Sequence, residues 1–478
     1  MKKRWLVLCC LVMLGCVSTA YALPYESYTY DSYQNVVPLP APYVPGEQIT
    51  GIGLGLSAFQ QPTDMMITDD GEIYLSDTGN DRIIVFRMDG SEAEVIGGYD
   101  LNGSRTAFSK PQGVYVRDGL LYVCDTGNGR VVALERRGAA WATHLVIERP
   151  DSLLLNETTA FAPLRVTVDA AGRVYIIGRN VLEGLMYFDD AGRFQGYFGT
   201  IKVQVSVADW IWRQLATQEQ RKKQTLFIPT EFTGLDIDGE GFIFTTEVNA
   251  SASEPLKRIN PAGRDVIRNY TDLKLVGDLW HSDVGGVTGQ TEFQDIVAWD
   301  NGCYTALDSK RSRLFTYNEE GTLLYVFGGA GTELGMLSKP TAVEVHEGAI
   351  YVLDQGRGVL LRYDPTSFGQ AVNAAATAQH LGDDGTVAES WQQVLKLCAH
   401  YEPAYAGLGK AYLTAGDNDK AMEYLERGMD RRYYSVALRR YRAEQVKKWF
   451  VPVIGALLVA AVACTVIRRL HRRGRKHA

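Results

Sequence analysis

Between residues 50 and 370, short runs of alternating apolar and polar residues recur along the chain, separated by turns rich in Gly, Asp and Asn. Successive side chains of a β-strand point to opposite faces, so a period of two is typical of strands. Gly, Asp and Asn favour the tight turns that reverse the chain between antiparallel strands. The pattern therefore predicts an all-β region over residues 50–370.

The runs and turns group into a unit that recurs six times. The sequence PTDMMITDDGEIYLSDTGNDRIIVFRMDG at residues 62–90 returns as PQGVYVRDGLLYVCDTGNGRVVALERRG at residues 111–138, and four further copies begin at residues 163, 233, 293 and 340. A repeat of this size with about four strands is typical of a β-propeller, in which each unit forms one blade. Six units predict a six-bladed β-propeller.

Three features of the unit resemble the NHL-repeat propellers, within the wider group of TolB-like and gluconolactonase-like propellers. Units start with Pro-x-Gly or Pro-x-Asp, carry Asp-x-x-Asn-x-Arg at the second turn, and end on Gly-rich stretches such as VFGGAG at residues 326–331. The resemblance covers residues 50–365 and is best in units one, two and six. NHL propellers are mainly binding scaffolds, so the resemblance implies a binding function.

Residues 23–49 form an N-terminal extension ahead of the first unit. Its Tyr-rich stretch YESYTYDSYQ, at residues 25–34, is predicted to add an outer strand that closes the ring of blades.

Residues 385–447 lack the strand pattern and are predicted to be helical. The stretch AYAGLGKAYLTAGDNDKAMEYLERG at residues 404–428 resembles a tetratricopeptide (TPR) repeat, with small residues where two helices cross. Further helices are expected around residues 386–400 and 432–447. Because one unit is short of a free-standing solenoid, we expect a TPR-like helical stalk near the membrane. Two roles stay open for it: a structural spacer, or a groove that binds a peptide or a partner from a membrane complex.

Both ends of the chain carry membrane-related signals. Residues 1–22 combine a basic start, an apolar run and an Ala-x-Ala motif, which indicates a secretory signal peptide. Residues 449–467 contain no charge and are long enough to span a bilayer as a transmembrane helix. The basic tail 468–478 is expected in the cytoplasm. We therefore expect a single-pass protein of a bacterial cell membrane, with residues 23–448 outside.

The charge is distributed unevenly along the chain. All 56 acidic residues but only 40 of the 49 Lys and Arg residues lie within 23–448, which gives this part a formal charge near −16. A surface of that sign disfavours a nucleic-acid partner. The cysteine spacing matches neither a disulfide framework nor a zinc site. The three cysteines of the outer part, Cys124, Cys303 and Cys398, are expected to be buried thiols.

Three units carry an Asp at the second turn and an Arg five residues later. The pairs are Asp77 with Arg82, Asp125 with Arg130, and Asp308 with Arg313. An Asp in such a turn accepts hydrogen bonds from backbone N–H groups, and the Arg can pair with it. Because the feature recurs from blade to blade, we interpret it as a structural brace of the turn.

The candidate binding site lies where the units differ from one another. At one equivalent position of the first strand, Asp64, Arg165 and Asp295 replace the small residues of the other units, and Glu231 lies just ahead of the fourth copy. By the order of strands in a blade, this position and the second turns surround one mouth of the central channel. The charged positions therefore predict a polar site at that mouth.

Two insertions enter on the same face and add aromatic residues. A helical insertion predicted at residues 203–225 carries Trp210 and Trp212, and a loop at residues 278–286 carries Trp280 and His281. Loops held by a rigid scaffold commonly form binding sites. The insertions and the charged positions together predict a ligand-binding site near blades three to five.

Each part of this site has a structural alternative. Asp64, Arg165 and Asp295 would also suit a salt-bridge ring that lines the channel. The tryptophans of the insertion would also suit packing anchors, and His281 would suit an ordinary loop position.

Three functions are compatible with these features. The first is a membrane-anchored extracellular binding or scaffold protein whose propeller mouth binds a carbohydrate, a peptide or a protein. The second is a metal-dependent, lactonase-like hydrolase, in which Asp64, Glu231 and Asp295 bind a divalent cation such as calcium, although Arg165 nearby disfavours a cation. The third is a structural subunit of a membrane transport or envelope complex. We identify no catalytic residue and expect no cofactor apart from such a cation.

Overall fold

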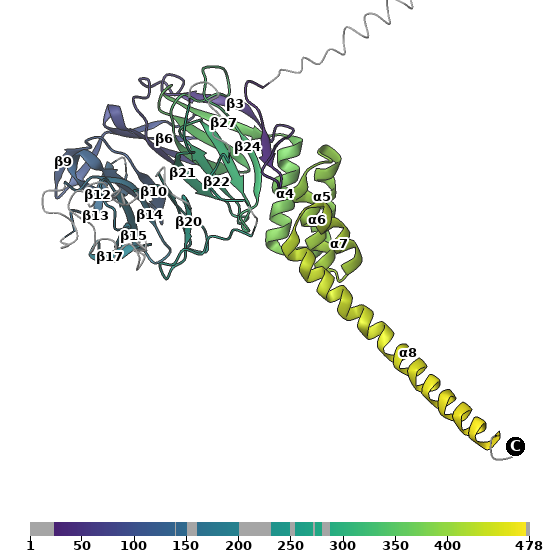
Figure 1. The fold of residues 1–478 in the computed structure, drawn as a ribbon. Helices are drawn as coiled ribbons and strands as arrows, with labels where there is room; N and C mark the ends of the chain where they lie inside the picture. Colours follow the sequence, from purple (N-terminus) through teal and green to yellow (C-terminus); the bar gives the residue numbers. More distant parts are fainter. Residues whose placement is uncertain are drawn as a thin grey trace, which may run out of the picture.

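The computed structural model describes residues 23–138, 140–150, 160–199, 231–248, 254–270, 273–279 and 287–474. The strands gather into a propeller, a group of short helices packs beside it, and one long helix projects away from both (Figure 1). The six-bladed β-propeller predicted from the repeats is confirmed by six separate sheets.

Each sheet corresponds to one repeat unit, with the strands in chain order from the inside outward. Blade 4 shows three strands within the described residues, and blades 2 and 5 carry extra strands at their outer edge. The bounds are β4 Asp64–Ile67, β5 Glu72–Asp77, β6 Arg82–Arg87 and β7 Glu94–Ile96 in blade 1; β10 Val114–Arg117, β11 Leu120–Asp125, β12 Arg130–Arg137 and β13 Ala140–Ile147 in blade 2, with β8 Gly98–Leu101 and β9 Ser104–Ala107 beside β13; β14 Pro163–Val168, β15 Val174–Gly178, β16 Leu185–Phe188 and β17 Phe194–Phe198 in blade 3; β18 Phe232–Ile237, β19 Ile243–Glu247 and β20 Leu256–Ile259 in blade 4; β21 Phe293–Ala298, β22 Tyr304–Asp308, β23 Arg313–Tyr317 and β24 Leu323–Phe327 in blade 5; and β25 Pro340–His346, β26 Ala349–Asp354 and β27 Val359–Pro365 in blade 6.

The first strands of the six blades form a closed ring. Each of them, β4, β10, β14, β18, β21 and β25, contacts the first strand of the next blade, and β25 contacts β4 again. These strands therefore surround the central channel.

Both faces of a blade are buried between its neighbours. On β5, Ile73 and Leu75 pack with Leu353 of blade 6, whereas Tyr74 shares a core with Val114 and Val123 of blade 2. Alternate side chains of one strand thus reach two different cores, because a strand directs successive side chains to opposite faces.

The ring is closed by β3 Tyr43–Thr50, which supplies the outermost strand of blade 6. It pairs antiparallel with β27, from Val359 opposite Thr50 to Pro365 opposite Tyr43. The first and the last parts of the propeller thereby share one sheet, which holds the ring together without a covalent link.

The predicted ring-closing strand does come from the N-terminal extension 23–49, as β3, but the Tyr-rich stretch 25–34 to which the prediction assigned it adds its outer strand to blade 5. Its strand β1 Tyr28–Tyr30 pairs with β24 of blade 5 and with β2 Val36–Pro38. Tyr28 and Tyr30 are buried there, and both hydroxyls donate to the carboxylate of Asp278. The Tyr side chains are therefore used to cover the outer edge of blade 5, and the closing strand follows them in the chain.

The described residues after the propeller form five helices. Their bounds are α4 Ser367–Leu381, α5 Asp384–Leu397, α6 Glu402–Thr414, α7 Asn418–Arg427 and α8 Arg431–Gly474. The Thr366 hydroxyl caps α4 by accepting from the Gly369 N–H, and Gly382 ends it in the left-handed conformation. The helical region thus starts ahead of the predicted 385–447, because α4 was not expected.

Small residues allow α6 and α7 to pack closely, as the sequence predicts. A Cβ on Gly409 would lie 2.4 Å from Cγ of Leu425, and one on Gly428 would lie 2.3 Å from the backbone nitrogen of Ala406. Neither position has room for a larger side chain.

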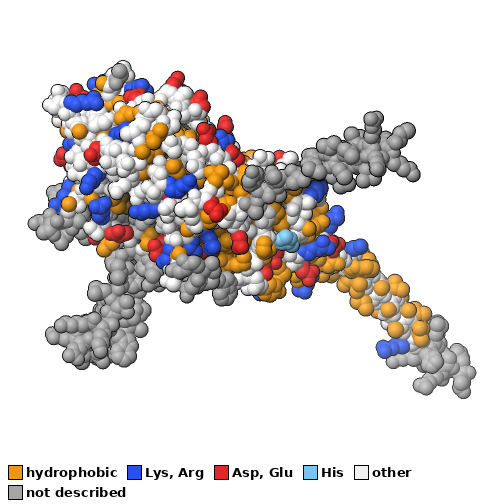
Figure 2. Space-filling model, turned by 90° about the horizontal axis from the view of Figure 1, so that it is seen from above, with side chains coloured by type: hydrophobic (Ala, Val, Ile, Leu, Met, Phe, Trp, Pro, Cys, Tyr) orange, Lys and Arg blue, Asp and Glu red, His pale blue; other side chains and the backbone are white. Residues whose placement is uncertain are grey.

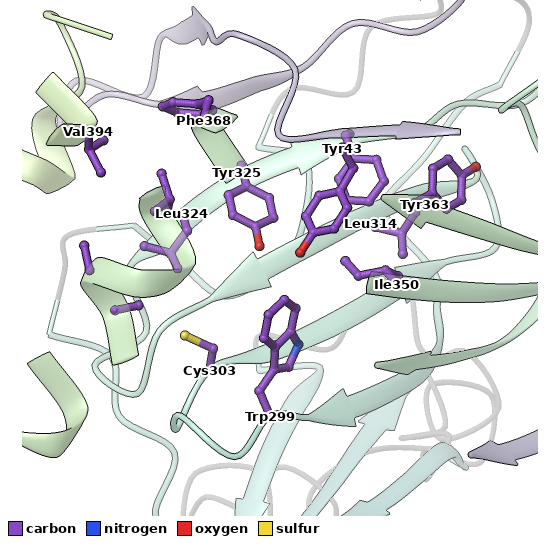
Figure 3. Close-up of a cluster of buried hydrophobic side chains, with 14 of the residues drawn as sticks. Tyr43, Trp299, Cys303, Leu314, Leu324, Tyr325, Ile350, Tyr363, Phe368 and Val394 are labelled. Carbon is purple, nitrogen blue, oxygen red and sulfur yellow. The ribbon is translucent and has the colours of Figure 1, made fainter. Parts of the chain in front are cut away.

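One apolar core joins the helices to the propeller. Tyr43, Trp299 and Tyr325 of blades 5 and 6 pack with Phe368 of α4 and Val394 of α5 (Figure 3). This cluster makes the helical region a part of the propeller's own core, so it is not a separate stalk.

Polar contacts fix the same joint in register. The Tyr325 hydroxyl donates to Oδ1 of Asn373 at 2.8 Å, and the Tyr401 hydroxyl donates to the carbonyl of Leu324 at 2.8 Å. Buried hydrogen bonds of this kind select one arrangement among the many that apolar packing alone would allow. Helices α4 and α6 therefore face blade 5 in a single defined orientation.

We predict that Gly369→Ala loosens this joint. A Cβ at Gly369 would lie 2.1 Å from the carbonyl oxygen of Pro42, so the backbone of one element has to shift. We expect the free energy of unfolding to fall by about 1–3 kcal/mol, measured by denaturant unfolding of the full chain in detergent. Gly385→Ala is the control, because its nearest atom is Oδ1 of Asp383 at 3.6 Å. Equal effects of the two substitutions would contradict the prediction.

Candidate functional site

The three charged residues predicted at the channel mouth meet across the channel. Nη1 of Arg165 pairs with Oδ1 of Asp64, and Nη2 lies 3.9 Å from Oδ1 of Asp295 and donates to the Thr341 carbonyl at 2.7 Å. The three residues come from blades 1, 3 and 5, so their contact has to cross the axis of the ring. Each charged side chain is at most 10% exposed. The three charged groups therefore bind one another and are shielded from solvent, so they are not available to a ligand in this arrangement.

Aspartates on the first strands also bind the backbone of the next blade. Oδ2 of Asp64 accepts from the N–H of Val114 at 2.9 Å, and Oδ2 of Asp295 accepts from the N–H of Val343 at 2.9 Å. The first strand is the inner edge of its sheet. The N–H groups on its channel side therefore have no further strand to pair with. These carboxylates therefore satisfy backbone donors and link adjacent blades.

A second layer of carboxyl groups lies two residues further along the first strands. Asp236 of β18 accepts from the N–H of Ala298 at 2.7 Å, in the same manner as Asp64 and Asp295. Burial raises the pKa of Asp236 to about 7, and it raises the pKa of Glu344 of β25 well above its ordinary value. Asp236 and Asp295 raise the pKa of Glu344 further, while Arg165 lowers it.

Sequence comparison at a single position of the unit missed this layer. Aligning the next inward-facing position of each first strand would have revealed it, because the residues there are Met66, Tyr115, Thr167, Asp236, Val297 and Glu344. Asp236 and Glu344 are the two acidic residues of this series.

Glu231 is not brought into the channel cluster. Its Oε1 accepts from the backbone N–H of Asn180 at 2.8 Å, and Asn180 has a positive φ of 58° in the turn after β15. Glu231 therefore ties the altered turn of blade 3 to the start of blade 4. Within the described residues, no three His, Cys, Asp or Glu side chains are placed to hold one metal ion.

Four of the predicted site residues, Trp210, Trp212, Trp280 and His281, lie outside the described residues. Their role in ligand binding stays a prediction.

The turn motif of blades 1 and 2 binds the chain that leads into the same blade. Asp77 accepts from the N–H of Gln60 at 2.6 Å, from Nδ2 of Asn80 at 2.8 Å and from Nε of Arg82 at 2.7 Å. Asp125 accepts from Ser109, Asn128 and Arg130 in the same way. Both carboxylates are fully buried, so the motif holds the second turn against the entry to the first strand.

Blade 5 keeps the Asp of this motif but uses the Arg differently. Asp308 accepts from the N–H groups of Lys310 and Glu292 at 2.9 and 3.1 Å, and burial raises the pKa of Asp308 to about 6. Nη1 of Arg313 lies 2.5 Å from Oδ2 of Asp278 instead of pairing with Asp308. The buried carboxylate of Asp278, which the sequence comparison missed, attracts the guanidinium away from its own turn.

Residues 108–134 match the NHL repeat. The matched segment contains the braced turn of blade 2, including Asp125 and Arg130, and the NHL repeat is thus confirmed where the sequence resembles it best. No curated protein matches the chain.

Several solved structures resemble the chain at low identity. A streptogramin B lyase is 9% identical over 68% of this chain and 98% of its own, with a TM-score of 0.41. A virginiamycin B lyase from Staphylococcus aureus is 9% identical over 68% of this chain and 100% of its own, with a TM-score of 0.43. The major Malassezia sympodialis allergen Mala s 1 is 11% identical over 68% and 96%, with a TM-score of 0.43. At these scores, no activity follows for this chain.

A cavity of about 400 Å³ lies between the propeller and the helices. Tyr30 and Trp391 form part of its wall, and the Glu402 carboxylate inside it accepts from the N–H of Ser32 at 3.1 Å. Lys410 in the same wall pairs with Glu320 and lies 3.4 Å from Asp430. The charge of Lys410 is therefore compensated by Glu320 of blade 5, across the joint.

We predict that Arg165→Met destabilises the protein strongly. Removing the guanidinium leaves Asp64 and Asp295 buried without a counter-charge, which costs about 3–5 kcal/mol of the free energy of unfolding. Denaturant unfolding measures the loss. The triple variant Asp64→Asn, Arg165→Met, Asp295→Asn should recover most of it, because its amide oxygens still accept the backbone N–H bonds. A loss below about 1 kcal/mol for Arg165→Met would show that the pair is not structural.

We also predict that Asp236→Asn removes a dependence of stability on pH. The pKa of Asp236 is about 7 in the folded protein, whereas its ordinary value is 3.8. At a pH between these two values, the folded state binds a proton that the unfolded state has lost. The free energy of unfolding therefore falls as pH rises from about 4 to 7, by up to about 4 kcal/mol, and is then constant.

The Asn variant lacks this proton, so its melting temperature should rise relative to the native protein between pH 4 and pH 8. Thermal unfolding at four pH values tests this. Asp300→Asn, at an exposed turn position, serves as the control and should give a constant difference. A constant difference for Asp236→Asn as well would refute the prediction.

Proposed function

We propose that the protein is a single-pass, membrane-anchored scaffold that presents its propeller to a binding partner outside the cell. The observation that carries this proposal is α8, a single helix of 44 residues that begins in the packed helical region and continues through the apolar stretch 449–467. The helix is long and apolar enough to cross a membrane.

Exposure of the apolar stretch supports the anchoring. Val451, Leu457 and Val459 are 72, 62 and 71% exposed, and the orange side chains of this helix project into open space in Figure 2. Monomeric proteins rarely leave so large an apolar surface in water. A bilayer of about 30 Å would cover a stretch of this length.

The joint between α8 and the propeller supports the scaffold part of the proposal. The Tyr433 hydroxyl of α8 donates to Oε1 of Glu320 in blade 5 at 2.9 Å, and Lys410 of α6 pairs with the other oxygen of the same carboxylate. Glu320 is 7% exposed, so these contacts are shielded from solvent. A buried hydrogen bond and a buried ion pair thus hold the propeller to the anchoring helix.

The TPR-like helices fit the role of a spacer better than that of a peptide groove. Their face around Tyr401 and Leu408 already packs on blade 5 within the common core. A peptide bound on that face would have to displace the propeller. We therefore assign the helices to positioning the propeller above the membrane.

The propeller mouth remains the proposed binding face for a protein, peptide or carbohydrate. Asp64, Arg165 and Asp295 are occupied by one another, so the loops that carry Trp210, Trp212, Trp280 and His281 are the groups we propose for partner contact. The lactonase-like alternative has less support, because the carboxylate of Glu231 binds blade 3 and does not join the other two acids.

We predict that the full chain stays in the membrane fraction after extraction with alkaline carbonate, whereas a chain ending at residue 448 is released. Protease added to intact cells should degrade the propeller but leave a tag fused to residue 478 protected. A matched variant that replaces the apolar stretch by poly-Leu should behave as the native chain, because only apolar length is required. Release of the full chain by carbonate would contradict the proposal.

A further inference from the structure

A ring of basic side chains surrounds α8 just before the apolar stretch. Between residues 439 and 448 the helix carries one acid, Glu444, whose Oε1 accepts from Nδ2 of Asn418 at 2.6 Å. We call the exposed basic residues of this segment the basic collar, and its members are Arg439, Arg442, Lys447 and Lys448. Within the described residues no carboxylate pairs with any of them. Arg440 is excluded, because Nη1 donates to the Leu413 carbonyl at 3.1 Å.

The collar lies at the height of a headgroup layer. At 1.5 Å per residue, Lys447 and Lys448 lie within about 3 Å of Trp449 along the helix axis, Arg442 about 10 Å away and Arg439 about 15 Å away. The headgroup region adds about 5–7 Å to each side of the hydrocarbon. Two collar side chains therefore lie within this region, and the other two lie within reach of its outer surface.

The collar faces all sides of the helix. Successive residues turn by about 100°, which places Arg442, Arg439, Lys447 and Lys448 at four well-separated directions. A protein partner would meet one or two of these charges on a single face, whereas lipid headgroups surround the helix. The arrangement favours lipid as the counter-charge.

The collar is positively charged, whereas residues 23–448 as a whole carry a negative net charge. Residues 23–448 carry a formal charge near −16 although they contain the collar. An anionic lipid surface attracts the collar and repels the propeller. Both forces act within about one Debye length, roughly 8–10 Å at physiological salt.

We propose that the basic collar binds the headgroups of anionic phospholipids in the leaflet that α8 enters from residue 448, an inference that rests on the proposed membrane anchoring. Because α8 is joined to blade 5 through Tyr433 and Glu320, this binding sets the height of the propeller above the bilayer. The basic tail beyond residue 467 would bind lipid in the opposite leaflet, so the experiment has to separate the two.

The test uses the full chain in vesicles of 70% phosphatidylcholine and 30% phosphatidylglycerol. Spin-labelled forms of each lipid report, by electron spin resonance, which lipid associates with the protein. The tail variant, with Arg468, Arg469, Arg472 and Arg473 changed to Gln, is the starting point. The collar-plus-tail variant also changes Arg439, Arg442, Lys447 and Lys448 to Gln. A control-plus-tail variant instead changes Arg137, Arg193, Lys420 and Arg427, whose side chains are 56–76% exposed.

We expect the tail variant to prefer phosphatidylglycerol about threefold or more at low salt, and to lose this preference at high salt. The collar-plus-tail variant should show a preference near one, while the control-plus-tail variant should keep that of the tail variant. No preference in the tail variant, or equal losses in both combined variants, would overturn the proposal. A change in oligomeric state caused by the collar substitutions, with unchanged lipid preference, would also overturn it and indicate a protein contact.

Carbonate extraction of every variant separates this proposal from the anchoring itself. All variants should remain in the membrane, because the apolar stretch is unchanged. If they are released, the proposed anchoring fails. If they are retained without lipid preference, only the collar proposal fails.

Discussion

Tyr43 joins the closure of the ring to the packing of the helices, and the rest of the architecture depends on this contact. Its side chain lies on the closing strand β3, is fully buried, and stacks on Phe327 of blade 5 at 4.9 Å between ring centroids. Its hydroxyl donates to the Gly348 carbonyl of blade 6 at 2.9 Å and accepts from Asn373 of α4 at 2.8 Å. Opening the ring would therefore also release α4. The ring and α4 are therefore expected to be stable only together.

The channel shows how charged residues can be structural in a propeller. Arg165 spans the axis to two aspartates of other blades, and the same aspartates bind the backbone N–H groups of Val114 and Val343. Such groups have few free lone pairs or donors left for a ligand. The partner binding that we propose therefore falls to the loops around the mouth, while the channel residues hold the blades together.

The repeated features of the fold could be predicted from the sequence, because each repeat unit shows the same local pattern again. The period of two and the spacing from Asp77 to Arg82 depend on neighbouring residues, and the six blades follow from them. The closing strand Tyr43–Thr50, helix α4 and the pairing of Arg313 with Asp278 depend on contacts between distant parts of the chain. Within the candidate site, Asp64, Arg165 and Asp295 were found because they differ from their counterparts, whereas Asp236 and Glu344 lay one inward position further along.

For the membrane span that we propose, Pro452 gives an independent reason to place the boundary at the collar. A proline inside a helix has no N–H, so the carbonyl four residues earlier, at Lys448, lacks its usual partner. In hydrocarbon an unpaired carbonyl costs several kcal/mol, whereas water and headgroups can satisfy it at the interface. A boundary at residue 449 leaves this carbonyl among headgroups, next to the basic side chains that attract them. In the proposed membrane span, the break in backbone bonding and the basic collar therefore belong to the same depth of the bilayer.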